Sequence, residues 1–282
     1  PYRILDVADL TVDGSFGTGG AVCVMCLLSG QNVWVSLLMA LLAGLLSGLV
    51  TGVLHTFMGI PAILAGILTQ LSLYSINLKI MGKANQGLSV RDNHVLLSQM
   101  DVPGALVVLA IAAVLVVAVL YLFFGTELGA SLRATGSNPN MSRAQGINTN
   151  FTKVLGLMLS NGLVALSSAL LAQYQGFADV NMGRGAIVIG LAAVIIGEVI
   201  FGKVFRNFAL KMLAVAIGAI LYYLVYQVVI WLGLNTDDMK LITALIVAAF
   251  LAIPYWKGKY AHVKVPAGSA NAGAKTGGDQ DA

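Results

Sequence analysis

Long uninterrupted apolar runs are the feature that most constrains how this chain can fold. Several stretches of about 20 residues carry no charge, the length a helix needs to cross a bilayer. Hydrophobic residues make up 58% of the 282 residues and charged residues only 10%, whereas a soluble domain carries about 25% charged residues. Because lipid offers the backbone no partner, spanning runs must be helices or barrels, and these runs do not alternate as barrel strands do. The sequence therefore predicts an all-α, polytopic transmembrane helix bundle.

The apolar runs fall into regular and irregular candidates for membrane helices. The regular ones are Val33–Leu54, Pro103–Phe124, Val154–Tyr174, Ala209–Leu232 and Leu241–Trp256, and the irregular ones are Phe16–Leu28, Pro61–Leu78 and Ala186–Phe201. We expect about eight to nine membrane segments, some of them broken or re-entrant. Residues 1–257 then form one transmembrane domain, and the Lys-, Gly- and Ala-rich residues 258–282 form a disordered tail.

Basic residues in the short connections predict the orientation of the bundle. They occur in Gly125–Thr152, around Lys203 and Arg206, and at the end of the last helix. Cytoplasmic loops are enriched in Lys and Arg, so we expect these regions and the C-terminus in the cytoplasm. Because one span separates Lys79–Asp101 from Gly125, that loop is expected on the outer side.

A polar segment, Asp9–Phe16, stands directly before a short glycine-rich apolar run. It either lines a translocation pathway built from broken helices, or is an interfacial cap in which Asp13 or Ser15 begins a helix. A weaker copy, Asp179–Gly183, precedes another short run and predicts two related halves. The candidate pathway residues are Asp9, Thr11, Asp13, Gly14, Ser15, Asn77, Asn181 and Glu198.

Among these candidates, Glu198 lies within the apolar run Ala186–Phe201, a few residues before the basic residues Lys203 and Arg206. A carboxylate in a membrane segment is a functional candidate because its burial is costly. The alternative is that Glu198 lies at the cytoplasmic interface and pairs with Lys203 or Arg206.

Small residues recur in the apolar runs. Gly44, Gly48 and Gly52 are spaced four apart and predict a flat face where a second helix packs closely. Cys23 and Cys26 lack further soft ligands nearby, so we interpret them as packing residues and predict no metal site.

The loop Thr126–Asn150 has a well-defined local pattern. Thr126–Ala134 is compatible with a helix that Gly136 ends. Asn138 is then an N-cap followed by Pro at the first helical position, and Gly146 closes the short helix Asn140–Gln145. A loop this ordered is expected to dock onto a partner.

Catalytic motifs are absent from the sequence. It contains no phosphate-binding GxxxxGK[ST] loop, no HExxH and no nucleophile elbow, and His55, His94 and His262 are scattered. We therefore expect that the chain is not an enzyme. Its basic residues lie in short loops, where they set membrane orientation, so we also expect no nucleic-acid binding.

The loop Gly129–Asn148 resembles the cytoplasmic coupling loop of ABC importer permeases of the branched-chain amino acid and ribose type. Asp9–Phe16 is similar to that family's Asp-Leu-(Ser/Thr)-Val-Gly stretch. Together with Leu73–Leu78 it most resembles a subgroup associated with uptake of aromatic amino acids or related small molecules. Family members have a whole helix before the Asp9 segment, so the first helix is expected to be truncated. The implied coupling residues are Leu132, Arg133, Ala134, Gly136, Asn138, Pro139, Met141, Ser142, Arg143, Gly146 and Ile147.

The resemblance implies a multi-component importer in a bacterial plasma membrane. Two permease subunits, a homodimer in the favoured reading, would enclose the pathway. Separate ATPase subunits would bind ATP and Mg and grip the coupling loop, and an extracellular binding protein would deliver a small solute near Lys79–Asp101 and Phe177–Arg184. An amino acid is favoured, with a nucleoside or sugar as alternatives. The competing function is an ion-coupled secondary transporter or channel, for which Glu198 is the candidate carboxylate.

Overall fold

The structure is a computed structural model that describes residues 2–5, 7–89, 95–201 and 208–231, together with Leu245 and Ala248. Apart from Leu245 and Ala248, the predicted Leu241–Trp256 helix lies outside the described residues, as do the basic turn around Lys203 and Arg206 and the tail. The elements in chain order are α1 (Tyr2–Leu5), α2 (Thr11–Leu28), α3 (Val33–Thr56), α4 (Ala62–Met81), β1 (Asn85–Gly87), α5 (Val102–Gly125), α6 (Glu127–Ser137), α7 (Pro139–Ala144), α8 (Thr149–Gln175), β2 (Phe177–Asp179), α9 (Ala186–Phe201) and α10 (Phe208–Trp231).

The described helices confirm the all-α, polytopic class. Six of them are long and apolar enough to cross a membrane, namely α2, α3, α4, α5, α8 and residues Leu210–Val228 of α10, and α9 is a shorter apolar helix. The described part of the chain thus accounts for fewer spans than the eight to nine expected.

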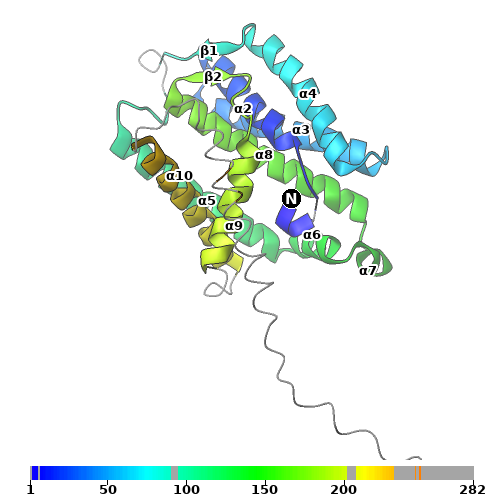
Figure 1. Cartoon of the computed structure of the whole chain (residues 1–282). Helices are drawn as coiled ribbons and strands as arrows, with labels where there is room; N and C mark the ends of the chain where they lie inside the picture. The colour runs from blue at the N-terminus through cyan, green and yellow to red at the C-terminus, as the bar shows by residue number, and fades with distance from the viewer. Residues whose placement is uncertain are drawn as a thin grey trace, which may run out of the picture.

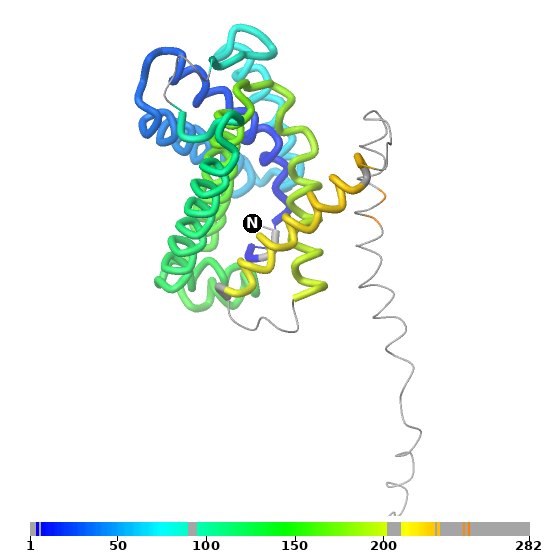
Figure 2. Tube along the Cα trace, turned by 90° about the vertical axis from the view of Figure 1, so that its left-hand side faces the viewer, coloured from blue at the N-terminus to red at the C-terminus, as the bar shows by residue number. Residues whose placement is uncertain are grey.

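Four helices, α2, α3, α4 and α8, form the core of the bundle (Figure 1). Their contacts use small residues, since Cβ atoms at Gly44 and Gly48 of α3 would overlap the α8 backbone at Asn161 and Leu157. A Cβ at Gly52 would lie 3.0 Å from the Cα of Val154. Backbones can approach this closely only where a side chain is missing. Outside this core, α9 packs against α10 (Figure 2).

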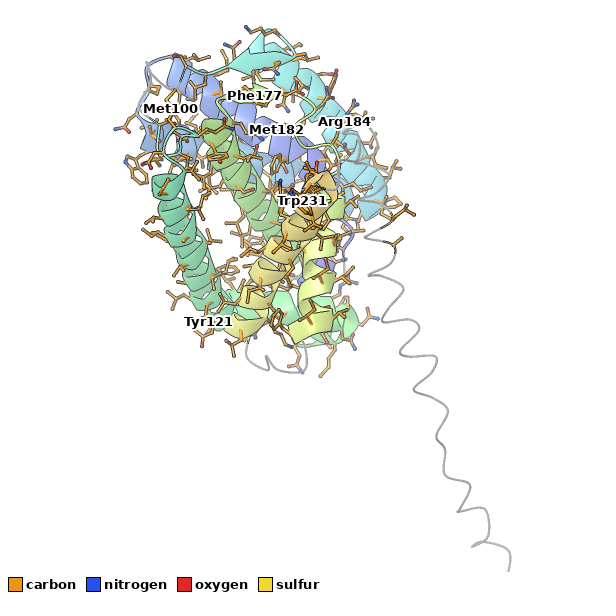
Figure 3. All side chains as sticks on the ribbon, turned by 60° about the vertical axis from the view of Figure 1, so that its left-hand side comes forward. Met100, Tyr121, Phe177, Met182, Arg184 and Trp231 are labelled. Carbon is orange, nitrogen blue, oxygen red and sulfur yellow. The ribbon has the colours of Figure 1, made fainter. Side chains whose placement is uncertain are left out.

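The two ends of the bundle differ. At one end β1 and β2 pair antiparallel, with Asn85 opposite Asp179 and Gly87 opposite Phe177. The ribbon joins the two loops predicted on the outer side, and α6 and α7 lie at the opposite end (Figure 1). Met100 and Phe177 mark the ribbon end in Figure 3, and Tyr121 of α5 lies at the other. This short ribbon is a departure from the purely helical expectation.

Two predicted helix boundaries were wrong. The first apolar helix begins at Thr11, not Phe16, and continues unbroken through Gly17 and Gly19. Similarly, α6 continues through Gly136 to Ser137. The reason is tertiary packing, because a Cβ at Gly19 would overlap Ala165 of α8, and one at Gly136 would overlap the Ile4 carbonyl of α1. Close packing at these positions outweighs the low helix propensity of glycine.

Candidate functional site

The loop between α5 and α8 folds into two capped helices. The Thr126 side chain accepts a hydrogen bond from Gly129 N and begins α6. Asn138 begins α7 as the sequence predicts, with its Oδ1 atom 3.1 Å from Met141 N. Gly146 follows the helix with φ of +80°, a left-handed conformation that glycine adopts at little cost. Local side-chain chemistry therefore fixes the shape of this loop.

The α6–α7 unit presents an exposed surface away from the bundle. Met141 is 62% exposed, and Arg143 is also exposed, with its Nε donating to the Thr149 hydroxyl at 2.8 Å. Leu132 and Ser142 are buried. Of the remaining predicted coupling residues, those exposed are Arg133, Ala134, Asn138, Pro139 and Gly146, and those partly buried are Gly136 and Ile147.

The inner face of α6 anchors this unit to the bundle. Leu132 belongs to a buried apolar cluster with Leu5, Phe124 and Leu157. The Thr135 hydroxyl also lies 3.0 Å from the hydroxyl of Thr152 on α8. A force applied to the exposed surface would therefore reach the membrane helices through packed side chains.

A buried polar network lies where α2 begins, near the middle of α8. Asp9 Oδ2 accepts a hydrogen bond from Asn161 Nδ2 at 2.7 Å, and Asn161 Oδ1 accepts one from Ser15 Oγ at 2.7 Å. The other Asp9 oxygen accepts from Thr11 N at 3.0 Å. All four residues are at most 3% exposed. Each polar group is paired, as burial at membrane depth requires.

Hydroxyl groups extend the network to two more helices. Thr11 Oγ1 lies 2.6 Å from Thr51 Oγ1 of α3, and Thr51 donates to Thr69 Oγ1 of α4 at 2.9 Å. Sequence reasoning singled out Asp9, Thr11 and Ser15 but missed Asn161, Thr51 and Thr69. These three residues could have been found from the sequence, because each is a polar residue within an apolar run, and such residues in membrane helices form interhelical hydrogen bonds.

Asp13 lies beside the network but serves a different helix. Its Oδ2 accepts from Gly185 N and its Oδ1 from Ile187 N, both at 3.1 Å. It thus caps α9, whereas α2 itself begins after Leu10 with no side-chain cap. The neighbouring Gly14 faces α4, where a Cβ would lie 2.9 Å from the Cα of Gln70.

The other candidate pathway residues lie apart from this network. Asn77 of α4 is 1% exposed, and its Oδ1 has no hydrogen-bond partner among the described residues. Asn181 is exposed beyond the ribbon, with its N–H donating to Asp179 Oδ1 at 2.6 Å. Glu198 is partly buried in α9, and its expected partners Lys203 and Arg206 are outside the described residues. The structure therefore groups Asp9, Thr11 and Ser15 but does not assemble all eight candidates.

Comparison with known proteins agrees with this architecture. The family model described as "Branched-chain amino acid transport system / permease component" matches residues 2–253. The chain belongs to this permease family. The permease is 42% identical over 89% of its length to a tyrosine transport system permease protein of Clostridioides difficile, and covers 83% of that protein. It is 36% identical to an uncharacterized protein of Rickettsia prowazekii, over 87% of each chain.

More distant relatives are also importer permeases. A fructose import permease protein of Bifidobacterium longum is 27% identical over 85% of this permease and 67% of that protein. Autoinducer 2 import system permease proteins of Salmonella strains match 68% of the chain. No solved structure matches the chain at a significant level.

Family membership confirms the predicted class of function. The chain is a permease subunit of an ABC importer, a multi-pass membrane component and not an enzyme. ATP is used by a partner ATPase, and such importers also work with a solute-binding protein. Among the described residues, no group of three or more His, Cys, Asp or Glu side chains could hold a metal ion. Because an ATPase drives transport in this family, the secondary-transporter alternative with Glu198 as its ion-coupling carboxylate is not required.

Proposed function

We propose that this permease forms the pathway for uptake of an amino acid, with ATP hydrolysis transmitted through α7. The exposed surface of α7 is the observation that carries the proposal. A bundle in lipid has no need of an ordered polar helix pair at one end, yet here Met141 projects at 62% exposure from a capped helix. An exposed Met beside Arg143 suits a protein–protein contact, since Met and Arg are enriched in interfaces.

We infer that the α6–α7 end lies in the cytoplasm and the ribbon end outside. Basic residues at the α7 end support this orientation. The ribbon then offers the paired loops around Gln86 and Ala178 to a binding protein. In this arrangement the binding protein delivers solute at the ribbon end, and the ATPase acts on α7 at the opposite end.

The pathway is proposed to lie between two permease copies, with a homodimer favoured. Supporting this, the contacts of α2 and α3 with α8 are at backbone distance, and the network around Asp9 is satisfied within one chain. A solute path through that packed core would have to separate these helices.

The amino acid assignment draws on the tyrosine transport relative, and a sugar is the second candidate because of the fructose import relative. The test is uptake by proteoliposomes holding the permease, its ATPase and its binding protein, with tyrosine, fructose and a nucleoside as solutes. We expect ATP-dependent uptake of the amino acid alone. Uptake of fructose or the nucleoside with exclusion of amino acids would overturn the assignment.

A further inference from the structure

The start of α9 lies beside the start of α2 and not at the ribbon end. After β2 the chain runs along α2. A Cβ placed at Gly17 would lie 3.2 Å from the Val180 carbonyl oxygen, and one placed at Gly20 would lie 3.2 Å from Met182 Sδ. Gly183 then meets the Asp13 backbone, where a Cβ would overlap the Asp13 carbonyl. The first turn of α9 is thus held beside the first turn of α2.

Asp13 makes this joint with both of its carboxylate oxygens. They accept hydrogen bonds from Gly185 N and Ile187 N at 3.1 Å each. The N–H groups of a first helical turn have no partner within their own helix, and a carboxylate there is also favoured by the helix dipole. Such charge-assisted bonds are stronger than neutral ones. Here the cap comes from another helix, 172 residues earlier in the chain.

Beyond this joint, α9 and α10 form a tight pair. A Cβ at Gly197 would overlap the Ala214 carbonyl, and one at Gly218 would overlap the Ala193 carbonyl. Ala192, Ile196 and Tyr222 are buried together between the two helices. The core helices are held together in the same way by the glycines of α3. Two closely packed groups of helices therefore meet at Asp13 and Gly183, and α10 also contacts α5.

We propose that Asp13 is a positioning residue for transport, whose carboxylate latches the α9–α10 pair onto α2 and releases it as the permease alternates between its two access states. The inference rests on the importer function above. Two directional hydrogen bonds at one residue give a joint with two discrete states, bonded and released, while the packing on either side is kept. Replacement by Asn would keep the shape but leave one acceptor oxygen and place an NH2 group against a backbone N–H.

Spin labels can follow the joint directly in the complete transporter. Leu46 of α3 is 60% exposed, Val188 of α9 is 42% exposed and Leu171 of α8 is 36% exposed. Each is replaced by Cys for labelling in a Cys23→Ala, Cys26→Ala background. We expect the distance between labels at Leu46 and Val188 to change between nucleotide-free and ATP-bound complexes, while the distance between Leu46 and Leu171 stays constant. An unchanged Leu46–Val188 distance through the cycle would overturn the proposal without reference to any Asp13 variant.

Asp13→Asn supplies the second readout. We expect the released Leu46–Val188 distance to be populated without nucleotide, and the maximal uptake rate to fall about tenfold with an unchanged KM for the loaded binding protein. Ser72→Ala, which loses only the hydrogen bond from the exposed Ser72 hydroxyl to the Leu68 carbonyl within α4, is the control. Wild-type distances or wild-type uptake in Asp13→Asn would contradict the latch. Absence of uptake in the unsubstituted transporter would instead count against the importer function.

Discussion

At the residue scale, Asn161 is the centre of the polar network because its amide both donates and accepts. It joins Asp9, just before α2, to Ser15 within α2. Asn161→Leu keeps the number of side-chain heavy atoms but removes both bonds and leaves the buried Asp9 Oδ2 atom without its donor. We expect a loss of about 1–3 kcal/mol in the free energy of unfolding, measured by denaturation in detergent. Ser72→Ala should change it by less than about 0.5 kcal/mol, and an Asn161→Leu protein as stable as that control would show that the network is dispensable.

At the element scale, the packing of α3 on α8 depends on missing side chains. Gly48→Ala would drive a Cβ into the Leu157 carbonyl, whereas Gly190 of α9 has nothing within 4 Å of the corresponding position. We expect Gly48→Ala to destabilise by about 1–3 kcal/mol through overpacking. Gly190→Ala should be neutral or stabilise by up to about 1 kcal/mol, because alanine is the better helix former. Equal effects of the two substitutions in thermal unfolding would argue against close packing at Gly48.

At the scale of the whole molecule, the α7 end and the ribbon end should face opposite sides of the membrane. Met141 is 62% and Phe177 is 37% exposed at these ends. With Cys23 and Cys26 replaced by Ala, we expect a membrane-impermeant maleimide to label Phe177→Cys in intact cells. It should label Met141→Cys only after permeabilisation. Labelling of both from one side would contradict the orientation.

The sequence was most informative where structure is set locally. Spans such as Val33–Leu54 lie within two residues of the observed helix, because apolar length alone defines them. Asn138 and Gly146 fixed α7 through capping chemistry that acts within a few residues. The roles of Asp13 and Asn161 depend on partners more than 140 residues away, which no local pattern encodes. The β1–β2 ribbon was also missed, because its strands have three residues each and no alternating pattern.

The central claim is that ATP-driven transport by this chain is transmitted through α7. Its most direct test is the double variant Met141→Asp, Arg143→Glu in proteoliposomes with the ATPase and the binding protein, with Ser72→Ala as control. Both residues are exposed, and the substitution removes the bond from Arg143 Nε to the Thr149 hydroxyl. Insertion should therefore match the control, and the free energy of unfolding should fall by no more than about 1.5 kcal/mol. We predict that ATPase co-purification is lost and that ATP-dependent uptake falls at least about tenfold. Uptake at the control rate, with the ATPase still bound, would contradict the account.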